Sequence, residues 1–181
     1  MPLPELKARM QPALPLKMVI ERAAPTIRIE RLKFEVVPER LLWAIAFIES
    51  AGGALNVPKH EPAYAPGGFY YKRKTEGGAR VRTLWNRWGD WAACSYSSFQ
   101  ILFVVAVELG FLGSPIDLWH DEEAIVWVVN LLNERIIEKK PESLEQIADA
   151  YNSGSFRDRH VPHEYIAKFI RAYDEVKVDE T

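Results

Sequence analysis

The sequence predicts a single, mainly α-helical domain with one long irregular insertion. The chain has 181 residues, the length of one domain, and 48% of them are hydrophobic, which is enough for one buried core. Apolar residues recur at helical spacing in five segments that follow residue 37. Between the first and second of these segments, residues 57–94 show no such spacing. The fold class follows from these three observations.

Residues 1–37 are predicted to form an N-terminal arm or extension. Four of the 12 prolines lie within the first 15 residues, and proline is unfavourable inside helices and central strands. Residues 27–36 alternate in part between apolar and polar side chains, as a short strand or an arm packed on the core would. The domain proper is therefore expected to span residues 38–176, followed by a tail at 177–181.

The first helix of the domain is predicted to begin at Pro38, because proline fits the first turn of a helix. Apolar residues follow at helical spacing as far as Ile48, and Gly52-Gly53 ends the helix. The insertion at 57–94 then combines prolines, glycines, aromatic residues and basic residues. Irregular segments of this length inside a compact domain are more often functional than idle.

Four more helices are predicted over residues 98–109, 121–139, 142–151 and 163–176. The second of them begins with three acidic residues and ends with two lysines, which is the charge distribution that the helix dipole favours. Pro141 ends this helix. No internal repeat or low-complexity tract interrupts the series.

Glu49 is the first candidate for chemistry. It follows Phe47 and Ile48 in the last turn of a very apolar helix. Partial burial raises the pKa of a carboxyl group, and a raised pKa allows it to act as a general acid in glycosidic cleavage near neutral pH. Taken alone, this position is more typical of a solvent-facing carboxylate at a helix end. Two other parts of the sequence change that balance.

Three short motifs occur in order, each at an end of a predicted helix. They are Glu49-Ser50, Ser97-Ser98-Phe99-Gln100-Ile101 and Ala150-Tyr151-Asn152-Ser153-Gly154. A weaker fourth element is the tyrosine-bearing last helix, with Tyr165. In this order the motifs resemble the lytic transglycosylase domain shared with goose-type lysozymes, over residues 38–173. The second motif departs from the Gly-Leu-Met-Gln of many members, and the insertion resembles the enlarged loops of phage-encoded members.

The resemblance implies a lysozyme-like helical fold and a muramidase activity on peptidoglycan. Glu49 would protonate the bridging oxygen of the β-1,4 bond between N-acetylmuramic acid and N-acetylglucosamine, and would then act as a base. In a lytic transglycosylase, which is the expected reaction, it takes the proton from the muramyl C6 hydroxyl and a 1,6-anhydro ring closes. The resemblance also implies a set of substrate-binding residues: Ser50, Ser98, Gln100, Tyr151, Asn152 and Tyr165.

Three of these residues also have a structural interpretation. Gln100 stands where an amide bonds the backbone at a helix start. Tyr151 lies on the helix face of Leu144 and Ile147, and Tyr165 lies on the last helix, so both fit the role of core aromatics.

Two alternative functions stay open. A goose-type-like hydrolytic lysozyme, acting as an endolysin, would use water as the nucleophile and a second carboxylate to activate it. The insertion offers Glu61, Glu76 and Asp90 for that role, and no spacing singles one of them out. An inactive cell-wall-binding or virion-structural protein is the alternative from another class, although Glu49 with its intact flanking residues argues against it.

The insertion carries a group of aromatic residues and a group of basic residues. The aromatic residues, of which two or three are expected to stack on sugar rings, are Tyr64, Phe69, Tyr70, Tyr71, Trp85, Trp88 and Trp91. The basic residues are Lys72, Arg73, Lys74, Arg80, Arg82 and Arg87. Such a mixture also suits single-stranded nucleic acid. The net charge of -2 and the lack of a nucleic-acid-binding motif favour peptidoglycan glycan strands as the partner.

No metal, cofactor or membrane span is expected. His160 and His163 have ligand-like spacing, but Pro162 lies between them and no further ligand is close in the sequence. The longest apolar run, residues 99–107, is far shorter than the roughly 18 residues that a transmembrane helix needs. The single Cys94 excludes an internal disulfide.

The N-terminus lacks the features of a secretory signal. We therefore expect a protein that stays cytoplasmic until release, as an endolysin does, or a virion-associated enzyme, acting in either case on the cell wall. The sequence leaves the oligomeric state open.

Overall fold

The structure is a computed structural model that describes residues 15–155 and 163–176. It is mainly helical with one small three-stranded sheet, which confirms the mainly α fold class. Within these ranges, no helix is both long enough and apolar enough to cross a membrane.

The N-terminal segment is helical where the structure describes it. It contains α2 (Leu16–Ala23) and two 3₁₀ turns, η1 (Ala24–Thr26) and η2 (Ile29–Arg31). Val19 and Ile20 of α2 are buried in the core, which explains why a helix forms here and packs on the domain. The short strand considered for residues 27–36 is not present. Pro15 precedes the first turn of α2, where its missing N–H costs no hydrogen bond, and residues 1–14 lie outside the described range.

Helix α3 spans Pro38–Ser50 and begins where the sequence predicted. It packs on the last helix, α9 (His163–Glu175). Ala51 ends α3 in the left-handed conformation, with φ 53° and its N–H bonded to the end of the helix. The chain therefore turns away immediately after the last helical turn, which carries Glu49.

The insertion is not irregular, contrary to the prediction. It contains η3 (Pro62–Tyr64), α4 (Phe69–Lys72), α5 (Glu76–Trp88) and η4 (Gly89–Ala93). Helix α5 forms because Val81, Leu84 and Trp88 lie three and four residues apart and pack inward. Thr75 caps the helix by accepting a hydrogen bond from the Gly78 N–H at 3.3 Å. The helix was not predicted because two glycines occupy its first turn and basic residues lie between its apolar positions, so the helical spacing was not evident in the sequence.

The sheet has three short antiparallel strands in the order β1-β2-β3. They are β1 (Lys59–His60), β2 (Cys94–Tyr96) and β3 (Ile101–Leu102). In the turn between β2 and β3, Ser97 and Gln100 have positive φ angles of 70° and 48°. The helix predicted over residues 98–109 is therefore shortened to α6 (Phe103–Glu108), because a left-handed backbone cannot continue a right-handed helix.

The C-terminal half follows the predicted helices closely. A 3₁₀ turn, η5 (Asp117–Trp119), leads into α7 (Asp121–Leu131). Helix α7 runs on through a π-helical turn (Leu132–Ile136) and a 3₁₀ turn (Ile137–Lys139), so the long helix predicted here is present. Helix α8 spans Leu144–Ser153.

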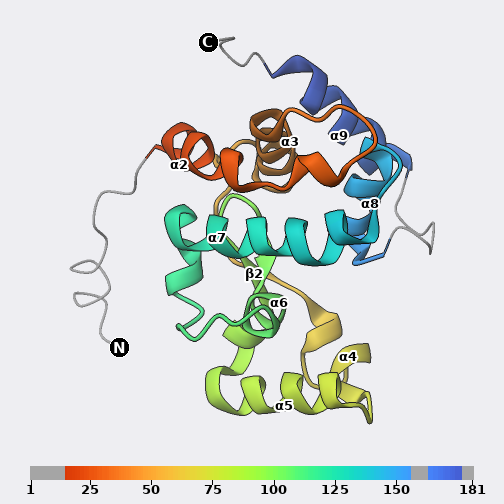
Figure 1. The fold of residues 1–181 in the computed structure, drawn as a ribbon. Helices are drawn as coiled ribbons and strands as arrows, with labels where there is room; N and C mark the ends of the chain where they lie inside the picture. Colours follow the sequence, from red (N-terminus) through yellow and green to blue (C-terminus); the bar gives the residue numbers. More distant parts are fainter. Residues whose placement is uncertain (1–14, 156–162, 177–181) are drawn as a thin grey trace.

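Figure 1 shows α7 running across the middle of the molecule. Helices α3, α8 and α9 lie on one side of it, and α4 and α5 lie on the other, with the sheet and α6 near the middle (Figure 1). Fully buried side chains from α3, α6, α7, α8 and α9 belong to one core, including Ile45, Phe103, Val128, Ile147 and Phe169. This core fixes the relative positions of the helix ends, including the end of α3 that carries Glu49.

Candidate active site

A cleft of about 780 Å³ separates the two sides of the molecule. One wall consists of Glu49 at the end of α3 and of residues 150–154 at the end of α8. The opposite wall consists of η3, α4 and the first turn of α5, all from the insertion. Residues of the β2–β3 turn, α6 and the π-helical turn line the space between them. The insertion thus completes the cleft.

Glu49 has the environment of a proton donor. The Tyr165 hydroxyl donates a hydrogen bond to Glu49 Oε1 at 2.8 Å. Burial raises the pKa of Glu49 above its ordinary value, Tyr165 and the charge of Lys59 oppose the rise, and the charge of Glu61 adds to it. A carboxyl group that keeps its proton at higher pH than usual and faces a cleft can act as a general acid.

Replacing Tyr165 with phenylalanine is expected to raise the pKa of Glu49 further. The hydroxyl stabilises the ionised carboxylate, so its loss favours the protonated form. The measurement is an NMR titration of the Glu49 carboxyl carbon in both proteins.

Tyr173→Phe is the matched control for that titration. Tyr173 lies on the same helix, but its hydroxyl accepts a hydrogen bond from the Val37 N–H at 2.7 Å, at the opposite end of α3 from Glu49. The Glu49 titration should be unchanged in this variant. A Glu49 pKa that stays constant or falls in Tyr165→Phe would contradict the role given to Tyr165.

Ser50 and Ser98 do not reach the cleft surface, although both were expected to bind substrate. They are 1% and 0% exposed. Ser50 Oγ lies 2.7 Å from the Ser98 carbonyl oxygen and also accepts from the Gly53 N–H at 2.9 Å. These bonds tie the end of α3 to the β2–β3 turn. The two serines therefore hold the end of α3 and the β2–β3 turn in place beneath the cleft surface, and they are too buried to contact a ligand.

Asp121 holds the same turn from the other side, and the sequence analysis did not identify it. The Ser98 N–H donates to Asp121 Oδ1 at 2.8 Å, and the Ser98 hydroxyl donates to Oδ2 at 2.7 Å. Burial raises the pKa of Asp121, while the two bonds from Ser98 oppose the rise. Its only signal in the sequence was a place in the first turn of a helix, which two neighbouring acids share.

Gln100 lines the cleft but its amide is bonded to the protein. Its Oε1 accepts from Ser95 Oγ at 2.8 Å, and its Nε2 donates to the carbonyl oxygens of Ser97 and Val57 at 2.9 and 3.1 Å. The side chain thus joins the β2–β3 turn to the segment before β1. The backbone-bonding interpretation of Gln100 holds, although the residue belongs to a turn and not to a helix start.

Tyr151 and Asn152 both line the cleft at the end of α8. The Tyr151 hydroxyl donates to the Phe99 carbonyl oxygen at 2.8 Å, so α8 is joined to the same β2–β3 turn. Burial and then the negative charge of Glu49 raise the pKa of Tyr151. Asn152 is exposed at the end of α8. The predicted tyrosine–asparagine pair therefore lies beside the predicted acid.

Of the three candidates for a second carboxylate, Glu61 lines the cleft, and Glu76 and Asp90 do not. Lys59 Nζ lies 3.0 Å from Glu61 Oε1, and the Glu61 N–H donates to the Ala93 carbonyl oxygen at 2.7 Å. The Glu76 side chain is 91% exposed. The sequence could not decide among the three candidates. The structure favours Glu61, because it shares the cleft with Glu49 and its charge acts on that residue.

The aromatic residues of the insertion fall into two groups. Tyr64 and Tyr70 line the cleft, with their rings stacked at a centroid distance of 4.4 Å, and the exposed Phe69 stands edge-on to Tyr70. Four other aromatic residues of the insertion do not line the cleft: Tyr71, Trp85, Trp88 and Trp91. Tyr71 and Trp85 pack against each other, and Trp88 packs against Phe103. Tyr64 and Tyr70 are therefore the aromatic residues of the insertion that a ligand in the cleft can reach, and Phe69 lies next to them.

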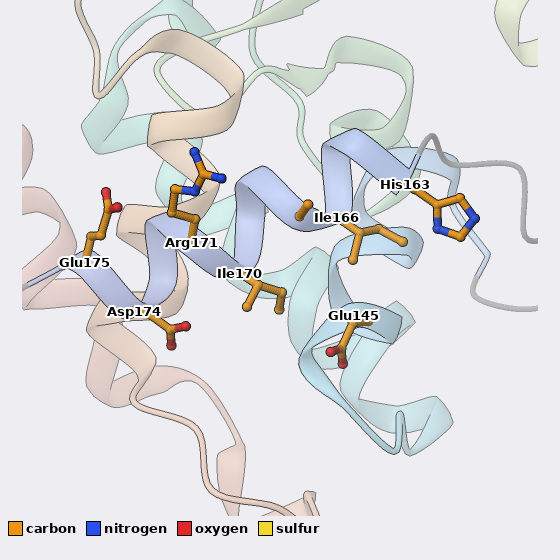
Figure 2. Close-up of a pocket in the computed structure, with 8 residues that line it drawn as sticks. Glu145, His163, Ile166, Ile170, Arg171, Asp174 and Glu175 are labelled. Atoms are coloured by element: carbon orange, nitrogen blue, oxygen red, sulfur yellow. The ribbon is translucent and has the colours of Figure 1, made fainter.

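Figure 2 shows a second hollow, on the surface of α8 and α9. Its volume is about 700 Å³, and its lining includes Glu145, His163 and Asp174. The labelled side chains point in different directions and do not converge on one place (Figure 2). His160, the neighbour considered for metal binding, lies outside the described residues. Among those that the structure does describe, no cluster of three or more histidine, cysteine or acidic residues is arranged to hold a metal.

Comparisons of the chain with protein-family models, with curated proteins and with solved structures gave no match. The assignment of function therefore depends on the residues around Glu49. What they offer together is a half-buried acid, an adjacent tyrosine and asparagine, a nearby second carboxylate and two stacked tyrosines in the wall of the cleft.

Proposed function

We propose that the protein is a peptidoglycan-cleaving muramidase with a lysozyme-like fold. The observation that carries the proposal is Glu49, a carboxyl group with a raised pKa and a tyrosine hydrogen bond, placed in the wall of a large cleft. The cleft also gathers Gln100, Tyr151 and Asn152, which belong to the motifs that resemble lytic transglycosylases and goose-type lysozymes. A cleft of this volume with stacked aromatic rings in its wall suits a glycan strand.

The proposed reaction is that of a lytic transglycosylase. Glu49 donates its proton to the oxygen that bridges N-acetylmuramic acid and N-acetylglucosamine, and the bond from this oxygen to the muramyl C1 breaks. The muramyl C6 oxygen then bonds to C1, and its proton passes to the Glu49 carboxylate. Tyr165 stabilises the ionised carboxylate between the two proton transfers. The acid is regenerated and the product carries a 1,6-anhydro ring.

Glu61 supports a second candidate, a hydrolytic lysozyme. A second carboxylate near the acid can activate water, which then attacks C1 in place of the C6 hydroxyl. Glu61 is close enough to Glu49 for its charge to raise the pKa of the acid. In this alternative the product has a free reducing end.

The two reactions are separated by mass spectrometry of digested peptidoglycan. For a transglycosylase, we expect 1,6-anhydromuropeptides from the wild-type chain and from Glu61→Gln alike. A hydrolase would release reducing-end muropeptides, and Glu61→Gln would lose most of the activity. Glu76→Gln is the matched control, because Glu76 belongs to the same insertion but is exposed outside the cleft. If the wild-type chain binds peptidoglycan and releases no product, the muramidase proposal fails in favour of a wall-binding or virion-structural protein.

A further inference from the structure

Arg73 differs from the other cations that line the cleft. Lys59 pairs with Glu61 at 3.0 Å, and Arg135 pairs with Glu108 at 2.9 Å. For Arg73, the part of the chain that the structure describes provides no carboxylate partner. The guanidinium therefore brings an unneutralised positive charge to the cleft.

The Arg73 side chain rests on an aromatic surface. Its guanidinium carbon lies 4.5 Å from the centre of the Phe69 ring and 5.0 Å from that of Tyr70. Tyr70 in turn stacks on Tyr64. Contact with ring faces restrains the guanidinium but leaves its N–H groups without a carboxylate. An arginine held in this way is suited to bind one in the fork geometry.

The backbone beneath Arg73 is fixed by close packing. Arg82 Nη1 donates to the carbonyl oxygens of Arg73 and Tyr71 at 2.9 and 2.7 Å. A Cβ atom at Gly78 would lie 2.1 Å from the Arg73 carbonyl oxygen, so only glycine allows α5 to approach so closely. The connection between α4 and α5 thus presents Arg73 from a rigid support.

The chemistry of the substrate indicates what this charge would bind. The sugar backbone of peptidoglycan is uncharged, and the negative charges of an intact strand belong to the peptide attached to the lactyl group of N-acetylmuramic acid. We propose that Arg73, with the Tyr64–Tyr70 stack beside it, binds a carboxylate of this stem peptide. The inference rests on the proposed muramidase function and adds that peptide-bearing strands are the preferred substrate.

Binding of small muramyl ligands tests the proposal without cleavage. The probes are N-acetylmuramyl-L-alanyl-D-glutamate, its fully amidated form, and N-acetylmuramic acid with its free lactyl carboxylate. Calorimetry should show that Arg73→Gln weakens binding of the first probe about tenfold or more, as loss of a charge-assisted bond does, and leaves the amidated probe unaffected. Equal dependence of N-acetylmuramic acid on Arg73 would assign the site to the lactyl group and overturn the peptide proposal.

Arg87→Gln is the matched control. Arg87 belongs to the same insertion and its guanidinium lies 4.9 Å from the centre of the Trp88 ring, but it does not line the cleft. Its replacement should leave the affinity for every probe unchanged. A loss of affinity equal to that in Arg73→Gln would show that general positive charge, not a site at Arg73, attracts the peptide.

Cleavage then separates this proposal from the proposed function. The wild-type chain should digest peptide-bearing strands several times faster than strands stripped of peptide by an amidase, and Arg73→Gln should lose that preference. Equal preferences in wild type and Arg73→Gln would overturn the peptide site while the muramidase stands. Absence of cleavage with Arg73-dependent binding intact would refute the muramidase while the peptide site stands.

Discussion

Replacement of Glu49 by glutamine is expected to reduce peptidoglycan cleavage by about 10²–10⁴-fold, the range that a positioned general acid contributes. Glutamine has nearly the same shape and can accept the hydrogen bond from Tyr165, so the fold should be retained. The measurement is the rate of muropeptide release from purified peptidoglycan. Glu39→Gln, in the first turn of the same helix, is the control and should keep full activity.

The same variant has an expected effect on stability. Because the folded protein raises the pKa of Glu49, it binds this proton more tightly than the unfolded chain does. The free energy of unfolding contributed by this group therefore falls as the pH rises from the ordinary carboxyl pKa through the raised one. Glutamine does not ionise, so Glu49→Gln removes this pH-dependent loss of stability. Urea denaturation should find the variant at least as stable as wild type at pH 7, with less advantage at pH 4, where both states keep the proton.

Either a near-normal rate or a variant that unfolds more easily at pH 7 would contradict this account of Glu49. A near-normal rate would mean that another group supplies the proton. Lower stability at pH 7 would mean that the carboxylate is stabilised, not penalised, by its surroundings.

Asp121→Ala is expected to lower the free energy of unfolding by about 2–4 kcal/mol, because two donors of a fully buried serine lose their acceptor. Activity should fall as well. Ser98 joins the β2–β3 turn to Ser50, and the adjacent Phe99 carbonyl accepts the bond from Tyr151, so a displaced turn moves both walls of the site. Chemical denaturation and the muropeptide assay measure the two effects.

The chain contains a matched control for Asp121. Asp117 Oδ2 also accepts from the N–H and the hydroxyl of a serine, Ser114, at 2.7 and 2.8 Å, but this pair is exposed. Water replaces the lost bonds there, so Asp117→Ala should cost less than about 1 kcal/mol and leave the activity unchanged. Equal costs at the two sites would show that burial of the Asp121–Ser98 pair has no special importance.

Much of the helical framework could be predicted from the sequence because it depends on local chemistry. Apolar spacing, Pro38 at the first turn and two glycines after the last one defined α3. Glu49 directly follows apolar residues at a helix end, where a carboxyl can be partly desolvated, but it was selected only in combination with the motifs at residues 97–101 and 150–154. Helix α5 was missed because Gly77 and Gly78 weakened its local signal, although its apolar face packs inward.

The strands and the β2–β3 turn could not be predicted in the same way. Each strand has two or three residues, and β1 pairs with β2 through partners such as Lys59 and Ser95, which are far apart in the chain. Pairing of this kind, together with the left-handed backbone at Ser97 and Gln100, replaced the start of the predicted helix. Long-range hydrogen bonding overrode local helical preference.

The sequence by itself determined which residue types were available: an acid after an apolar helix, a tyrosine–asparagine pair, and an insertion rich in aromatic and basic residues. Only the tertiary structure decided which of them meet. It brought the Tyr165 hydroxyl within hydrogen-bond distance of Glu49, although the two residues are 116 positions apart in the sequence. It also placed Glu61, and not Glu76, in the lining of the cleft. The reason is physical: burial and charge depend on distances in space, and packing of the helices on a common core sets those distances.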